Sequence, residues 1–195
     1  MSRRSSVPPG YPVQGREMEI TAYTPNDVGK IEKLFASTFS ASAGESEGAI
    51  VGGLAAELMR STGKADLYGF VARDGVDLVG SILFSRMWFE REIDAFILAP
   101  VATRTDHQRQ GVGQKLINFG LNVLKEDNVE LVVTYGDPRF YSKVGFRVVS
   151  ENRIPPPFKL SQPEGWMAQS LVGDLIDPIK GKSRCVEALN KPEYW

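Results

Sequence analysis

Residues 107–116 read HQRQGVGQKL. Two glycines, Gly111 and Gly113, stand one residue apart, and apolar residues with a helical period follow them. Glycine lets a backbone approach another molecule closely, and the free N–H groups that open a helix favour an anion. The stretch therefore predicts an anion-binding turn at the start of a helix. From the glycines alone, a tight turn without a ligand is an equally good interpretation.

Two common phosphate-binding patterns do not fit this chain. The dinucleotide pattern G-x-G-x-x-G fails because Leu116 stands where its third glycine belongs. A P-loop ending in GKS at 181–183 fails because Ile176 stands where its first glycine belongs. What remains is the glycine turn at 108–113, which follows an apolar strand and precedes a long helix, so that its N–H groups converge on one point. Two cationic residues flank or lie within it, Arg109 and Lys115.

The composition is that of a soluble globular protein. The chain has 195 residues, of which 42% are hydrophobic and 24% charged. A net charge of −1 argues against nucleic-acid and membrane-surface partners. One cysteine and one histidine are too few for a zinc site, so no metal is expected. The lone cysteine favours a reducing compartment, and no apolar run reaches the roughly 18–20 residues of a membrane span, so a cytoplasmic location is expected.

Residues 1–16 are rich in Ser, Pro and Gly and are predicted to form a flexible arm. Residues 17–195 are predicted to form a single domain with a C-terminal extension. That extension ends in Tyr194-Trp195, which would pack either on its own domain or on a second subunit. A homodimer is therefore a possible assembly.

The hydrophobic pattern predicts alternating strands and helices. Strands are expected at 18–23, 67–73, 77–89, 95–103, 131–135, 146–150 and 166–172. Helices are expected to begin after the N-caps Thr24 and Ser46, at Gly113, and at Pro138. Asp74-Gly75 indicates a hairpin, and a strand–helix–strand unit follows it. This order predicts an α/β fold with a mixed, mostly antiparallel sheet flanked by helices.

The stretch VATRTDHQRQGVGQKLINFGL at 101–121 resembles the acyl-CoA signature of the GNAT superfamily of N-acyltransferases. That signature consists of Gln or Arg, then any two residues, then Gly, then any one residue, and finally Gly or Ala. Gln108, Gly111 and Gly113 fill these places. GDPRFYSKVGF at 136–146 resembles the second family motif, in which an aromatic-Tyr pair precedes Gly-Phe.

The two motifs stand in the family order, with one helix and one strand between them. A subfamily of small bacterial GNAT acetyltransferases carries a similar second segment. The resemblance extends over residues 17–172 and implies the GNAT fold. The chain departs from the family pattern at three places: Thr105 and His107 replace a frequent Pro and aromatic residue, and Arg109 replaces a frequent Gly.

The resemblance implies acetyl-CoA as co-substrate and assigns the residues that bind it. The backbone of Val101 and Thr103 would bond the pantetheine arm where two parallel strands splay apart. Gln108 belongs to the signature, and Gln114 would reach the diphosphate through its side chain or backbone. The diphosphate would be held by the N–H groups of Arg109, Gln110, Gly111, Val112 and Gly113.

Tyr141 is the predicted catalytic residue. When an amine attacks a thioester, a thiolate must leave, and a tyrosine O–H near the sulfur can deliver a proton as general acid. Its ordinary pKa of about 10 keeps the phenol protonated at neutral pH. Alternatively, Tyr141 merely packs the short helix against the sheet, as Phe140 and Phe146 are expected to do.

The amine must also lose a proton before it attacks. Glu90, Glu92 and Asp94 are candidate bases, although a solvated turn is the favoured interpretation of each. His107 is expected in a surface loop near the phosphates. Cys185 is expected to be an inert thiol.

The predicted function is direct transfer of an acetyl group to a primary amine of a small molecule or peptide. The alternative is a GNAT module that binds or senses acyl-CoA, or docks an acyl carrier protein, without turnover. The resemblance implies that the first two helices, the hairpin of strands and the C-terminal strands build the acceptor pocket, but the acceptor itself is not predicted. Met87-Trp88-Phe89 and Trp166 would either line this pocket or fill the core, and core is favoured.

Overall fold

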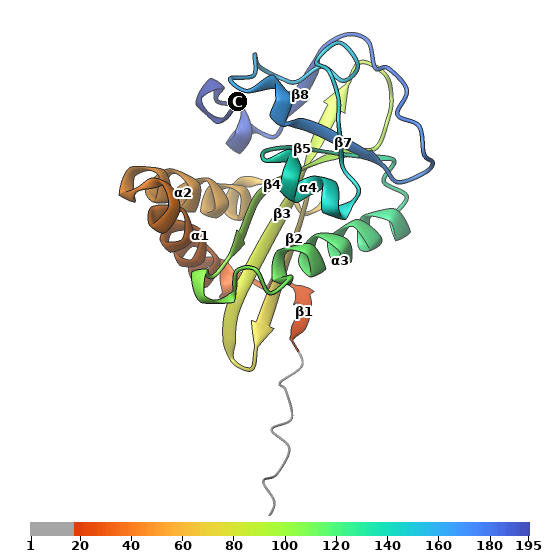
Figure 1. The fold of residues 1–195 in the computed structure, drawn as a ribbon. Helices are drawn as coiled ribbons and strands as arrows, with labels where there is room; N and C mark the ends of the chain where they lie inside the picture. Colours follow the sequence, from red (N-terminus) through yellow and green to blue (C-terminus); the bar gives the residue numbers. More distant parts are fainter. Residues whose placement is uncertain (1–17) are drawn as a thin grey trace, which may run out of the picture.

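A computed structural model describes residues 18–195, whose strands form one mixed eight-stranded sheet (Figure 1). The strands are β1 (Glu19–Ala22), β2 (Leu67–Asp74), β3 (Asp77–Phe89), β4 (Ala95–Thr103), β5 (Leu131–Tyr135), β6 (Arg147–Val148), β7 (Trp166–Ser170) and β8 (Ser183–Cys185). The α-helices are α1 (Val28–Ala43), α2 (Glu45–Ser61), α3 (Val112–Glu126) and α4 (Pro138–Tyr141). The predicted α/β class and mixed sheet are confirmed. The arm predicted at 1–16 lies outside the described residues.

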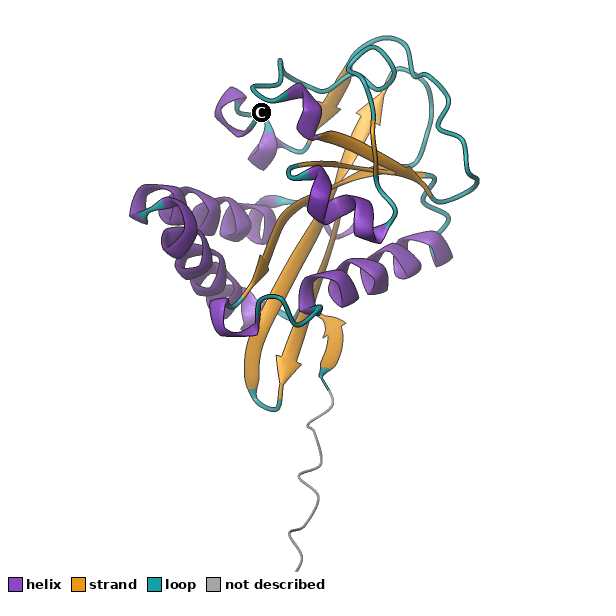
Figure 2. Ribbon diagram, viewed as in Figure 1, coloured by secondary structure: helices purple, strands orange, loops and turns teal. Residues whose placement is uncertain are grey.

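The sheet runs β1-β2-β3-β4-β5-β7-β6, with β8 beside β3. All of these pairs are antiparallel except β4–β5. A parallel pair needs a crossover connection, and α3 provides it. The helices cover both faces (Figure 2): α1 and α2 pack on one hydrophobic cluster and α3 on the other. Among the described residues, no helix is long and apolar enough to cross a bilayer.

The parallel strands β4 and β5 separate partway along their length. They pair from Ala95 with Leu131 to Leu98 with Thr134. Beyond Leu98, β4 continues to Thr103 and pairs only with β3. This leaves one edge of β4 unpaired where β5 has ended.

The predicted start of the first helical region is confirmed in detail. The Asp27 carboxylate accepts hydrogen bonds from the backbone N–H and the hydroxyl of Thr24, each at 2.8 Å. Arg73 of β2 donates to the same carboxylate at 2.7 Å. Asp27 is only 6% exposed, so this contact ties α1 to the sheet. Burial opposes the charge, but the bonds from Thr24 and Arg73 outweigh it and lower the pKa of Asp27 below 3.8.

We expect Asp27→Asn to lower the free energy of unfolding by about 2 kcal/mol at pH 7, because it leaves the largely buried Arg73 unpaired. The folded-state pKa is depressed, so the contribution is present above the unfolded pKa and is lost as the pH falls through the folded value. The deficit should therefore shrink in strong acid. Urea unfolding at pH 7 and in strong acid measures this difference in the free energy of unfolding. The control is Asp177→Asn, which lies in an exposed loop. Equal stability of wild type and variant at pH 7 would contradict this account.

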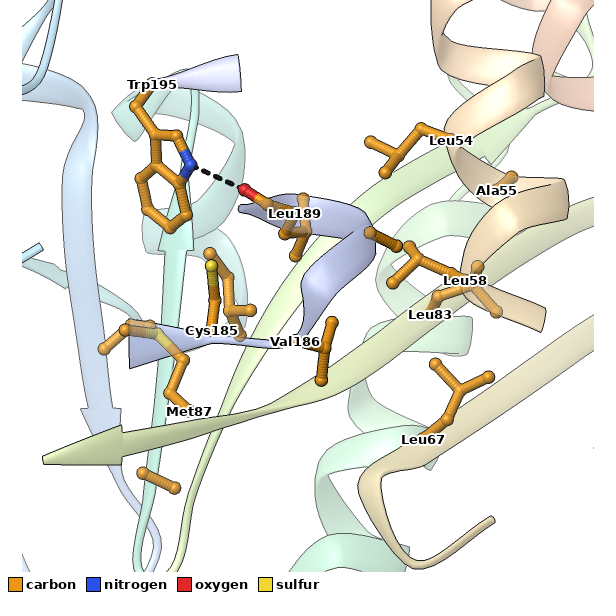
Figure 3. Packing of buried hydrophobic residues seen from close by; sticks show 14 of the residues in the cluster. Leu54, Ala55, Leu58, Leu67, Leu83, Met87, Cys185, Val186, Leu189 and Trp195 are labelled. Carbon is orange, nitrogen blue, oxygen red and sulfur yellow. Dashed lines mark hydrogen bonds between the residues drawn. The ribbon is translucent and has the colours of Figure 1, made fainter. Parts of the chain in front are cut away.

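The C-terminal segment (residues 183–195) packs on its own domain. Its strand β8 pairs with Met87–Phe89 of β3 and was not predicted. Figure 3 shows Val186 and Leu189 packed towards Leu58 of α2, and the Trp195 indole donates to the Leu189 carbonyl at 3.0 Å. Lys191 and Glu57 of α2 form an ion pair at 3.2 Å.

Three predicted features differ in extent or place. The second helix, α2, begins at Glu45 after the N-cap Gly44, so Ser46 lies inside the helix and does not cap it. The strands predicted at 146–150 and 166–172 are shortened to β6 and β7. After β6 the chain turns, because the Ser150 carbonyl accepts from the N–H groups of Arg153 and Ile154. Met87 and Trp166 are buried in the core, in agreement with the favoured interpretation.

Candidate active site

A cleft of about 1020 Å³ lies where β4 and β5 part. Its walls come from α1, α2, β4, the glycine turn, α4 and the C-terminal segment. The predicted site residues that line it are Val101, Thr103, Gln108, Arg109, Gly111, Val112, Gly113, Gln114 and Tyr141. One predicted residue, Gln110, does not line it, and its side-chain amide donates instead to the Asp106 carbonyl at 3.0 Å.

The glycine turn presents a row of free donors. Within residues 18–195, no protein acceptor is bonded to the backbone N–H groups of residues 109–114, and α3 bonding begins with Lys115 N–H to the Gly111 carbonyl at 3.0 Å. Arg109 and Gly111 both have left-handed backbone, with φ of 62° and 80°. Such a conformation turns successive N–H groups towards a common point, which suits an anion.

Side-chain and backbone contacts hold the turn against β4. The Gln108 amide donates to the Thr103 carbonyl at 3.2 Å. The N–H of Arg104 donates to the Val79 carbonyl of β3 at 2.8 Å. The turn is therefore anchored before a ligand arrives.

Each glycine of the turn meets a different constraint. A Cβ at Gly113 would come 3.2 Å from the Phe140 ring and 3.4 Å from the Thr103 hydroxyl, so the chain has little room there. A Cβ at Gly111 would meet no protein atom within 4 Å, but the positive φ disfavours any other residue. Gly111 thus faces open space and Gly113 a packed neighbour.

Tyr141 is held at the end of α4 opposite the turn. Asp137 caps α4 by accepting from the Arg139 N–H at 2.9 Å. A Cβ at Gly136 would lie 2.8 Å from the Tyr141 ring, so glycine is required for the ring to sit there. Burial raises the pKa of the Tyr141 phenol above 10, and its contact with the Thr134 hydroxyl offsets this in part. The phenol is therefore protonated at neutral pH.

The candidate bases Glu90, Glu92 and Asp94 do not line the cleft. Asp94 pairs with Arg86 at 2.6 Å, and Glu90 accepts from the Lys182 N–H at 3.0 Å. The carboxylates in the cleft wall are Glu47, Asp137 and Glu193.

The single histidine is more enclosed than a surface loop predicts. His107 lines the cleft, its Nδ1 lies 2.8 Å from Asp106, and its Nε2 lies 3.6 Å from Asp74 of β2. Cys185 is buried in the core, and burial raises the pKa of its thiol to about 11, which suits an inert role. The described residues contain no group of three His, Cys, Asp or Glu side chains placed to hold a metal ion.

The resemblance implies that the first two helices help to build the acceptor pocket, but sequence reasoning named none of the helix residues in one wall of the cleft. This wall is formed by Thr38, Phe39, Ser42, Glu47, Ile50, Val51 and Leu54 of the first two helices and by Leu189, Glu193, Tyr194 and Trp195. Sequence reasoning also missed Lys143, which follows Tyr141. The apolar residues of the C-terminal segment were the one available signal, since they indicate packing on a neighbouring surface.

Comparison with known proteins gives consistent matches. Residues 65–148 match the family model described as an acetyltransferase (GNAT) domain. The chain is 30% identical over 140 residues to the uncharacterized N-acetyltransferase YjhQ of Escherichia coli K12, covering 69% of this chain and 77% of the relative.

Solved structures share the fold over most of the chain. The GNAT family N-acetyltransferase YhbS from Escherichia coli, crystallised in complex with CoA, superposes with a TM-score of 0.79 at 22% identity and covers 93% of this chain and 97% of its own. A GNAT family acetyltransferase from Brucella melitensis in complex with acetyl-CoA gives a TM-score of 0.64 at 23% identity, with 89% and 99% covered.

Proposed function

The chain belongs to the GNAT acetyltransferase family, and from that premise we propose that it transfers an acetyl group from acetyl-CoA to a primary amine. The observation that carries the proposal is the row of free N–H groups at residues 109–114, which opens into the same cleft as the Tyr141 phenol. An anion-binding turn and an acid in one cleft suit a substrate that carries a phosphate group, which the turn can bind, and a leaving group, which the acid can protonate.

The residues of the cleft fit coenzyme A along its length. The glycine turn would hold the diphosphate, with Arg109 and Lys143 adding positive charge. The unpaired edge of β4, including Val101 and Thr103, offers backbone groups to the pantetheine arm as an adjacent strand would. The thioester would then lie where β4 and β5 part, within reach of α4.

The chemistry requires few groups from the protein. Acetyl-CoA supplies an activated acyl thioester. The amine nitrogen bonds to the carbonyl carbon, the carbon–sulfur bond breaks, and Tyr141 donates its proton to the departing sulfur. Solvent then returns a proton to the phenol and takes the one that the amine gives up.

We expect purified protein to release free thiol from acetyl-CoA only when a primary amine is present, because the amine is the attacking group. The measurement is thiol release over a panel of alkyl and aryl amines, with product mass confirming N-acetylation. Amine-independent release would indicate hydrolysis. Tight CoA binding without turnover across the panel would favour the binding-module alternative.

A further inference from the structure

The cleft wall carries charges of both signs. Arg109 and Lys143 line it together with the glycine turn and its free N–H groups. Glu47 of α2 and Glu193 of the C-terminal segment also line it, and the third carboxylate of the wall, Asp137, is paired with Arg139. Both Glu47 and Glu193 are exposed, and neither forms an ion pair with another residue in the part of the chain that the structure describes. In Figure 1 the turn before α3 lies below α4, and the C-terminal segment lies above it.

A buried polar group also lies in the cleft wall. Thr38 of α1 lines the cleft and is 8% exposed. Its hydroxyl has no hydrogen-bond partner among the described residues. A buried hydroxyl left unpaired costs free energy, so this group is ready to bond a polar ligand that enters the cleft.

The surface between these polar groups is apolar. Phe39 and Ile50 of the two helices and Tyr194 of the C-terminal segment contribute to it. Ile50 is 45% exposed in the cleft wall, so its apolar surface is open to a ligand that enters the cleft. An alkyl chain fits this surface better than a sugar or an amino-acid carboxylate does.

We propose that the acceptor is a small aliphatic amine that carries a second positive charge, and that Glu47 and Glu193 hold this second charge while the reacting amine faces Tyr141. The inference deepens the proposed acetyltransfer and rests on it. Alkyl ammonium groups are charged at neutral pH, and Glu47 and Glu193 present carboxylates in the cleft wall. Held near one another in a cleft, they attract. A carboxylate-bearing acceptor would instead be repelled by these two carboxylates.

A diamine therefore gains in binding over a monoamine of the same length, because only the diamine carries the second charge that the two carboxylates hold.

The test compares 1,4-diaminobutane with butylamine at saturating acetyl-CoA. We expect kcat/KM for the diamine to exceed that for butylamine on the order of tenfold, and the advantage to fall as salt is added. The double variant Glu47→Gln/Glu193→Gln should reduce the ratio of the two kcat/KM values to its statistical limit, because the diamine has two equivalent amino groups and butylamine has one. Glu45→Gln/Glu187→Gln, which removes exposed carboxylates from the same two segments outside the cleft wall, should leave the ratio unchanged.

Calorimetry of 1,4-diaminobutane with the CoA-bound protein separates the two proposals, and melting temperatures show that each variant is folded. Charge-dependent diamine binding without turnover would support the acceptor inference and overturn the proposed acetyltransfer. Equal kcat/KM for the two amines, or a ratio that the cleft variant leaves unchanged, would overturn the acceptor inference alone. Neither binding nor turnover of the diamine would overturn both.

Discussion

Replacing Gly111 and Gly113 together by valine is expected to weaken CoA binding on the order of 100-fold, or about 2.8 kcal/mol. At Gly111 the valine would stand in open space beside the free N–H groups, on a backbone whose φ of 80° disfavours it. At Gly113 it would push against Phe140 and Thr103. Both changes move the row of donors away from the diphosphate that we propose it binds.

Titration calorimetry with CoA measures this effect without interference from turnover. Gly53→Ala is the matched control, since a Cβ there meets nothing within 4 Å and Gly53 lies in α2 outside the cleft wall. A single Gly111→Ala change provides a milder second variant whose folding is less at risk. If CoA bound the double variant as tightly as the wild type, the turn would not be the diphosphate site.

Tyr141→Phe is expected to lower kcat by about 10²–10³-fold while leaving the Kd for CoA unchanged. The substitution keeps the ring, which packs edge-to-face on Phe140 and Phe146 at centroid distances of 5.0 and 5.8 Å, and removes only the proton donor. Tyr68→Phe is the control, because the Tyr68 phenol bonds Asp127 outside the cleft wall. An unchanged kcat would leave Tyr141 with a packing role alone.

The pH profile gives an independent test of the same residue. Burial raises the pKa of Tyr141 above 10, so the donor stays protonated throughout the range in which the amine gains its free form. The wild-type rate should therefore rise from pH 7 towards pH 10 without an alkaline decline. A decline centred well below pH 10 would indicate that a different acid is at work.

Much of the donor side of the site could be predicted because it is local in sequence. The glycine turn and the aromatic-Tyr pair both fall between Val101 and Phe146, so short sequence patterns are sufficient to locate them. The exception is Gln110, whose side chain turns back to the Asp106 carbonyl. No sequence pattern indicates this side-chain hydrogen bond, because it depends on the shape of the folded turn.

The residues that we propose for the acceptor side could not be named from the sequence, because they come together only in the folded chain. Glu47 and Glu193 are nearly as far apart in sequence as this domain allows, and neither belongs to a recognisable pattern. Asp94 is a candidate base in the sequence, and its ion pair with Arg86 is seen only in the folded structure. The strand β8 is three residues long, too short to show alternation.

The segment that matches the family model, residues 65–148, holds every residue that we assign to the donor substrate and to proton delivery. Thr38, Glu47 and Glu193 all lie beyond it, on elements that reach the cleft from either end of the described chain. On these assignments, changes in the flanking segments are expected to alter which amine is accepted, while the middle segment keeps the residues assigned to the reaction. Chimeras that graft foreign flanks onto this middle segment offer a direct route to new acceptor preferences.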